Sequence, residues 1–306
     1  MRQRLLEKLP YLDGVTNVRQ EKVIQGFLCV KTHLPEVGHT VLCSSVRRGA
    51  ECKTQWENRV SYFDRLKTEF ASTLAQFNNS SAMQRLHTGQ MSVNHYKSYL
   101  RQTFHYTKDN PQIQALATVH FRGSDREFVR MFYKHATSEI GHDMLALNDL
   151  ARLGEDVSQI RGENALPDTV ALNAFVFCQI YNGNPIGYLG YLFFLEFLPT
   201  SSGKGYMDLL EKIGVPREAM SFLLEHATVD VGHNRLMEKY VEGLIRDEQD
   251  FETVVYAMKV TGRLYANMLD GAFAHAENPM DWGVNHAELR RLADPAAATC
   301  SLVAGH

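Results

Sequence analysis

From residue 51 onward, apolar residues recur at steps of three and four positions along the chain. The first such stretch ends at Asn78-Asn79-Ser80-Ser81, where a serine can cap the helix that follows. A second stretch begins near Ser92, and Asn110-Pro111 marks the start of a third. Apolar positions that repeat with a period of 3.6 residues are typical of helices that bury one face. The pattern therefore predicts helices throughout this part of the chain.

The same periodicity continues through the middle and end of the sequence. Six further helices are predicted over residues 124–153, 168–181, 185–198, 204–213, 216–246 and 249–275. No run of alternating polar and apolar residues of the kind typical of a β-strand interrupts them. The predicted fold class is therefore all-α.

The two ends of the chain lack this regular pattern. We interpret residues 1–50 as an N-terminal extension and residues 51–277 as one helical domain. After Asn278-Pro279 the pattern weakens, so residues 278–306 are expected to form a C-terminal tail.

Composition and charge exclude several classes of protein. The net charge is −3, so no bulk positive charge points to nucleic acid or to an anionic membrane. The longest apolar run, Tyr188–Leu195, is far shorter than the roughly 20 residues of a membrane span. The N-terminus lacks the apolar core of a secretory signal, and the five cysteines form no CxxC pair. We therefore expect a cytoplasmic protein with reduced thiols, no nucleic-acid partner and no membrane association.

Two eight-residue segments of the sequence resemble each other. Residues 135–142 read HATSEIGH and residues 226–233 read HATVDVGH. On a helix, positions i, i+4 and i+7 fall within about 60° of one another, so two imidazoles and a carboxylate project from one face of each segment. Burying them is costly unless a cation is present, and transition metals prefer these ligand types. One such motif also suits a hydrogen-bonded network without a metal, but two copies favour a metal site.

A further carboxylate is expected from another helix. The almost wholly apolar stretch 187–195 is followed by Glu196, and a buried glutamate needs a partner. Glu196 is therefore a candidate bridging ligand. The alternative is that it only marks where the helix emerges into solvent before Pro199, in which case Glu163 or Glu225 is the next candidate.

Together these residues resemble the ligand pattern of the heme-oxygenase-like diiron oxidases and oxygenases. The stretch Tyr96–Tyr106 also resembles an early helix of that family, and the resemblance covers about residues 55–275. It implies a seven-helix, heme-oxygenase-like bundle with two iron ions, Fe(II) or Fe(III), with O2 as cosubstrate and without heme. The implied iron ligands and catalytic residues are Glu139, His142, Glu196, His226, Asp230 and His233. His135 is not part of the usual ligand set, and we interpret it as a side chain that supports a ligand without binding the metal itself.

The resemblance leaves the reaction open within one class of enzyme. We favour N-oxygenation of a small amine or amino acid in a biosynthetic pathway. The alternative within the class is oxidative C–C cleavage or decarboxylation of an amino or fatty acid. An alternative of another class is a metal-binding helical protein without oxidase activity. The expected partner is a small-molecule substrate, and both a homodimer and an external electron donor are compatible with the pattern.

Two further features bear on the substrate and on the branch of the fold. Arg101, Arg122 and Arg130 can form a clamp for a substrate carboxylate, although surface positions are the simpler interpretation. The thiaminase-like branch of the same fold relies on a cysteine nucleophile. The only mid-chain cysteine, Cys178, lies in an apolar run and is expected to pack in the core, which disfavours that branch.

Overall fold

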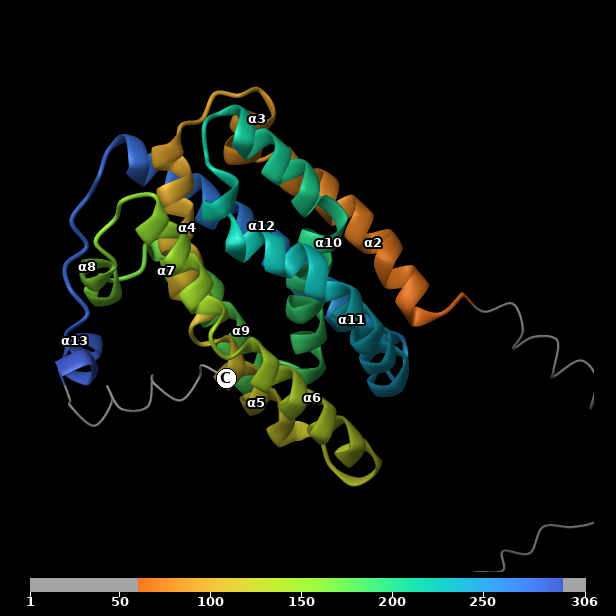
Figure 1. The fold of residues 1–306 in the computed structure, drawn as a ribbon. Coiled ribbons are helices and arrows are strands. Elements are labelled where there is room, and N and C mark those ends of the chain that lie inside the picture. Colours follow the sequence, from red (N-terminus) through yellow and green to blue (C-terminus); the bar gives the residue numbers. More distant parts are fainter. Residues whose placement is uncertain (1–59, 294–306) are drawn as a thin grey trace, which may run out of the picture. The chain divides into compact units, whose positions relative to one another are not determined.

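The computed structural model describes residues 60–293 (Figure 1), apart from the side chains of 229–231 and 291–293. In this part of the chain the only β-structure is an isolated bridge between Glu163 and Val284, so the predicted all-α class is confirmed. The expected extension at residues 1–50 lies outside the described residues. Between residues 60 and 293, no helix combines the length and the apolar character needed to cross a membrane.

Between residues 60 and 293, seven long helical segments form the bundle, if two consecutive helices separated by a sharp turn are counted as one. They are α2 (Tyr62–Asn78), α4 (Val93–Thr107), α6 (Arg126–Glu139) with α7 (His142–Arg152), α9 (Pro167–Asn182), α10 (Tyr188–Lys212), α11 (Ser221–Leu244) and α12 (Glu248–Glu277). The shorter helices are α3 (Ser81–His87), α5 (Asn110–Ala117), α8 (Val157–Gly162) and α13 (His286–Ala293). The last of these packs against α8.

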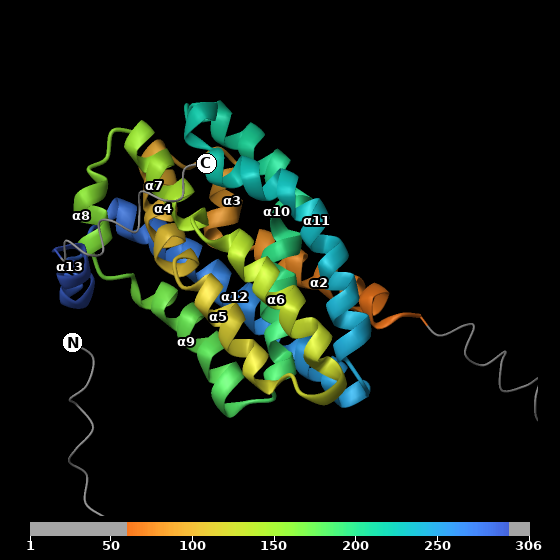
Figure 2. The ribbon, with the colours of Figure 1, turned by 60° about the horizontal axis from the view of Figure 1, so that its bottom comes forward.

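Helix α12 packs against α2, α4, α9 and α10, and it crosses the middle of the views in Figures 1 and 2. Its contact with α10 is unusually close at Gly190. A Cβ atom at this position would lie 2.1 Å from the carbonyl oxygen of Val254 and 2.6 Å from the amide nitrogen of Met258. Only glycine therefore permits this approach of the two backbones. The other side of α10 packs along α11, which places α10 beside the second histidine motif.

Aromatic side chains make up much of the core between α2 and α10. The ring of Phe70 lies with its centroid 5.8 Å from those of both Phe193 and Phe197. Full burial of a phenylalanine contributes about 1.5–3 kcal/mol to the free energy of unfolding. This packing holds α10 firmly between the neighbouring helices.

The predicted division of residues 185–213 into two helices is wrong, because α10 runs unbroken from Tyr188 to Lys212 through Pro199. Proline inside a helix removes a backbone hydrogen bond and costs about 3 kcal/mol. Apolar side chains are buried on both sides of it, with Phe197 before the proline and Met207 after it. Burial of these side chains thus offsets the local cost, which a sequence pattern does not reveal.

Candidate metal centre

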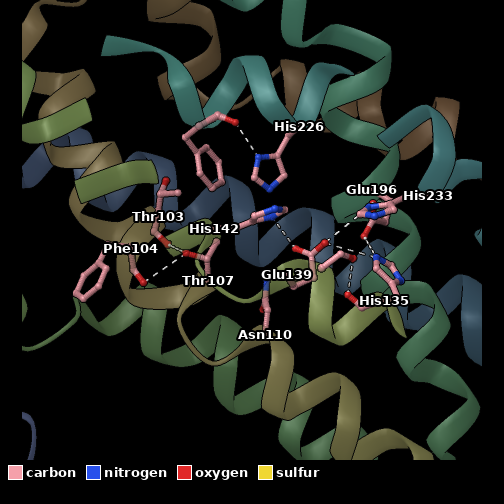
Figure 3. Close-up of polar contacts among 12 residues, drawn as sticks. Thr103, Phe104, Thr107, Asn110, His135, Glu139, His142, Glu196, His226 and His233 are labelled. Carbon is pink, nitrogen blue, oxygen red and sulfur yellow. Dashed lines mark hydrogen bonds and ion pairs between the residues drawn. The ribbon is translucent and has the colours of Figure 1, made fainter. Parts of the chain in front are cut away.

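Six side chains from four helices converge within the bundle (Figure 3). Their ligand-type atoms form two groups, and within each group these atoms lie within 4.8 Å of one another. The inner site consists of His135, Glu139, Glu196 and His233, and the outer site of Glu139, His142 and His226. Glu139 belongs to both sites. The structure thus brings together five of the six side chains that the resemblance implies as ligands, and adds His135.

The helix predicted over residues 124–153 is in fact two helices, and the break lies inside the first motif. Helix α6 ends at Glu139. Gly141 then adopts φ = 97°, a left-handed backbone conformation that residues other than glycine rarely adopt. Helix α7 then begins at His142. The turn leaves the His142 Nδ1 atom 3.0 Å from the Oε2 atom of Glu139. The chain direction therefore changes between two neighbouring members of the outer site.

The predicted helix start at Pro216 is also wrong, since α11 begins at Ser221 after a short 3-10 turn. The carboxylate of Asp149, which is fully buried, fixes this start. Its Oδ1 atom accepts hydrogen bonds from the backbone amide and the hydroxyl of Ser221, and its Oδ2 atom accepts one from the amide of Phe222. A carboxylate here satisfies the free amides of the helix N-terminus and interacts favourably with its dipole.

This start of α11 also orients His226. The Nδ1 atom of His226 lies 2.7 Å from the carbonyl oxygen of Phe222. Because a carbonyl can only accept a hydrogen bond, Nδ1 carries the proton and Nε2 keeps its lone pair. The backbone of α11 therefore prepares the Nε2 atom of His226 to bind a cation.

Glu196 lies inside the bundle, with only 7% of its surface exposed. Its Oε2 atom accepts a hydrogen bond of 3.0 Å from Nδ1 of His233, and its Oε1 atom lies 3.1 Å from Nε2 of His135. This burial excludes the alternative that Glu196 only marks an exit to solvent. Of the two replacement candidates, Glu225 is exposed and Glu163 pairs with Arg101.

The sixth implied ligand, Asp230, lies on the backbone of α11 between His226 and His233. Its side chain is outside the described part of the structure. Its role as a ligand stays a prediction.

Charge balance in the centre comes from the contacts between histidines and glutamates. Burial raises the pKa of Glu139, but its contacts with His135 and His142 outweigh burial and lower it. In Glu196 the contacts with His135 and His233 likewise outweigh burial and lower the pKa. For the imidazole of His226, burial disfavours the protonated form and so lowers the pKa, and the neighbouring His142 lowers it further. The carboxylates are therefore ionised, and His226 is neutral, as a metal requires of its ligands.

The donor atoms fit a transition-metal ion. Within the described part of the chain, both ring nitrogens of His135 and the Nδ1 atom of His142 are buried without a correctly aligned hydrogen-bond partner. Such atoms are costly to bury, and nitrogen and carboxylate ligands suit iron and neighbouring metals. Bound cations would supply partners for these atoms and for the charges of Glu139 and Glu196.

A cavity reaches the centre at Glu139, Glu196 and His226. It offers about 110 Å³ to the centres of water-sized molecules, which is room for several waters or a small substrate. Its walls are mainly apolar, and they include seven tyrosines: Tyr96, Tyr99, Tyr106, Tyr188, Tyr191, Tyr206 and Tyr265. No lysine or arginine is among the described residues that line it.

The candidate clamp of arginines does not form at this cavity. Arg101 pairs instead with Glu155 and Glu163, and Arg122 and Arg130 are exposed. The expectation that Cys178 packs in the core is wrong, because its side chain is exposed on α9 and does not line the cavity. An apolar sequence run does not show which of its members faces outward.

Two features of the site have only a weak signal in the sequence: the place of His135 in the centre and the tyrosines of the cavity. His135 occupies the same position in the first motif as His226 in the second, and this correspondence was the available signal for its place in the centre. Three tyrosines of the cavity, Tyr96, Tyr99 and Tyr106, lie on α4 in the stretch that resembles the early helix of the family. The other four come from α10 and α12, and no local pattern shows that all seven line one cavity.

The chain belongs to the family of iron-containing redox enzymes, which it matches over residues 97–266, more than half of its length. This range holds all the side chains of the inner and outer sites. The protein is thus a member of an oxidoreductase family. No curated protein matches the chain significantly.

Solved structures show the same fold. A domain of unknown function with a heme oxygenase-like fold from Shewanella denitrificans OS217 is 26% identical, with a TM-score of 0.61 over 74% of this chain and 93% of that one. A TenA homologue from P. horikoshii OT3 is 12% identical, with a TM-score of 0.59 over 70% and 99%. A TenA homologue from Pseudomonas syringae pv. tomato str. DC3000 is 13% identical, with a TM-score of 0.55 over 70% and 93%. The heme-oxygenase-like fold expected from the sequence is confirmed.

Replacing Glu196 by glutamine tests its predicted role as a ligand. The amide has nearly the same volume, so we expect a folded protein, but it binds a cation poorly. Metal content, measured by elemental analysis after anaerobic loading, should fall from about two ions per chain to about one. Glu211→Gln, an exposed position on the same helix, is the matched control. Full metal content in Glu196→Gln would remove this residue from the site.

Proposed function

We propose that this protein is a nonheme diiron enzyme that uses O2 to oxidise a small substrate held in the apolar cavity. One observation carries the proposal: two groups of histidines and carboxylates, joined by Glu139, lie where the cavity reaches Glu139, Glu196 and His226. Two groups that share a carboxylate favour two ions over one. Membership of a family of iron-containing redox enzymes supports iron as the metal.

The side chains of the centre have distinct tasks in this proposal. Iron, when bound, supplies the ability to bind and reduce O2. Glu139 and Glu196 offset the charge of the cations, and the Phe222 carbonyl holds the ring of His226 in one tautomer. The apolar wall of the cavity limits access of water and orients the substrate.

The lining of the cavity favours a substrate with an apolar body. A free amino acid would find no cationic partner for its carboxylate among the described lining residues. N-oxygenation of an amine with a hydrocarbon body is the reaction that we propose first. One oxygen atom of O2 enters an N–H bond and the other becomes water, so the reaction takes two electrons and two protons from an external donor.

Oxidative decarboxylation of a fatty acid is the second candidate. The same apolar lining suits its alkyl chain. The lining offers no lysine or arginine to its carboxylate either, so the cations of the centre, which lies beside the cavity, would have to hold that group. In this reaction the acid loses CO2 and two electrons, and an external donor supplies the remaining two for reduction of O2 to water.

Anaerobic titration with Fe(II), followed by O2, tests the proposed function. We expect about two ions per chain and O2 consumption that depends on the bound iron. Dodecylamine and dodecanoate are the probes, with free leucine as the polar comparison. Mass spectrometry distinguishes the gain of one oxygen atom from the loss of CO2.

The same experiment distinguishes an oxidising enzyme from a metal-binding protein without oxidase activity. A protein that binds two iron ions and consumes no O2 with any reductant is a metal-binding protein without oxidase activity. One firmly bound ion per chain with full turnover would contradict the two-ion centre. O2 consumption that persists without iron would contradict the proposal as a whole.

A further inference from the structure

The two repeated motifs cross in opposite directions, so that the first histidine of each meets the last histidine of the other. The ring centroids of His135 and His233 lie 4.2 Å apart, and those of His142 and His226 lie 4.8 Å apart. Each pair combines one histidine from each motif. The pairs belong to the inner and the outer site respectively.

Glu139 lies between the two pairs and presents one oxygen to each. Its Oε1 atom is 3.6 Å from Nε2 of His135 and 3.7 Å from Nδ1 of His233. Its Oε2 atom is 3.0 Å from Nδ1 of His142. A carboxylate that divides its oxygens in this way is placed to bridge two cations.

His135 is as deeply placed in the inner site as any other member. Only 1% of its surface is exposed, and neither ring nitrogen has an aligned hydrogen-bond partner among the described residues. Its Nε2 atom nevertheless lies 3.1 Å from Oε1 of Glu196. A histidine that only supported a ligand would donate an aligned hydrogen bond to that carboxylate. The contact of His135 lacks this alignment.

We propose that His135 is itself a metal ligand, whose Nε2 atom binds the ion of the inner site together with Glu196 and His233. The inference rests on the proposed two-metal centre and extends its ligand set beyond the six side chains implied by the resemblance. The inner site then has four protein ligands among the described side chains, including the shared Glu139, and the outer site has three.

Titration with Co(II) under anaerobic conditions tests this assignment without relying on activity. The readouts are the number of ions bound, their dissociation constants and the visible d–d bands, which depend on the ligands of the ion. We expect His135→Ala to raise the dissociation constant of the Co(II) ion in the inner site by more than about 100-fold and to change the d–d bands of that ion. His142→Ala should weaken only the binding of the Co(II) ion in the outer site.

A second variant distinguishes a ligand from a supporting group. His135→Gln keeps a hydrogen-bond donor near the position of Nε2, so it should restore binding if His135 only supports Glu196. We expect it to be as defective as His135→Ala, because an amide is a poor ligand. Both variants are first checked for helical content and thermal unfolding without metal. His120→Ala, which removes an exposed histidine, is the matched control.

The possible results separate the two proposals. Wild-type Co(II) binding and bands in His135→Ala, or recovery of both in His135→Gln, would overturn the assignment of His135 and leave the proposed function intact. A wild-type chain that binds no Co(II) and no Fe(II) would overturn both. Loss of the inner ion in both variants, with the outer ion retained, supports the assignment.

Discussion

Glu139→Gln should lose both metal ions at once, the largest effect of any single substitution in the centre. Glu139 is the only described side chain that belongs to both sites, and each of its oxygens faces a different histidine pair. The amide keeps the volume but lacks the negative charge that offsets two cations. We expect the Fe(II) affinity of both sites to fall by more than about 100-fold and O2 consumption to disappear.

The matched control for this prediction is Glu225→Gln. Glu225 is exposed on α11, beside His226 in sequence, so the substitution removes one nearby charge without touching the centre. Elemental analysis and circular dichroism are run on both variants. Two ions retained in Glu139→Gln would show that Glu139 binds neither. A single ion retained would restrict Glu139 to one site.

Asp149→Ala should cause a large loss of stability without removing any member of the metal centre. The Asp149 carboxylate accepts bonds from two backbone amides and one hydroxyl at the start of α11, and it is completely buried. Its removal leaves these donors without a partner, at about 1–3 kcal/mol for each buried group. We expect the free energy of unfolding of the metal-free protein to fall by about 3 kcal/mol in urea denaturation.

Asp156→Ala is the comparison that isolates the effect of burial. Asp156 also caps a helix, since its Oδ1 atom accepts a hydrogen bond of 3.0 Å from the amide of Ser158, but it lies at an exposed position. Water can replace the lost cap there, so the free energy of unfolding should fall much less in Asp156→Ala than in Asp149→Ala. Equal losses in the two variants would contradict the role given to the buried carboxylate. Asp149→Asn, which keeps one oxygen, should lie between wild type and Asp149→Ala.

The cap also connects stability with metal binding. His226 lies in the second turn of α11, and its ring is held by the carbonyl of Phe222, the same residue whose amide bonds to Asp149. Fraying of this helix end would therefore loosen the outer site before the inner one. The α11 member of the inner site is His233, two turns further along the helix.

The neighbouring solved structures limit what fold alone can say about function. The TenA homologues share the heme-oxygenase-like fold at 12% and 13% identity, which carries the fold and nothing more. The function proposed for this chain rests on the side chains of the centre and on the cavity beside it. The exposed position of Cys178, away from the cavity, gives no support to a cysteine nucleophile at this site.

The sequence by itself determined the helical class and most members of the centre. Helical periodicity and the spacing of a histidine, a carboxylate and a second histidine are local properties, because residues three, four and seven apart are neighbours on a helix. Ser92 and Asp109 precede α4 and α5 where the start signals predict. The burial of Glu196 could be anticipated too, since the residues before it are almost wholly apolar.

Tertiary structure alone decided how these elements meet. The break at Gly141 is a left-handed glycine conformation that helical periodicity does not reveal. The unbroken helix through Pro199 and the pairing of His135 with His233 depend on contacts between helices distant in sequence. The energies involved in such packing exceed local helix propensities, so local rules fail at these points. The tyrosine-lined cavity has the same origin, because its walls exist only once the helices are assembled.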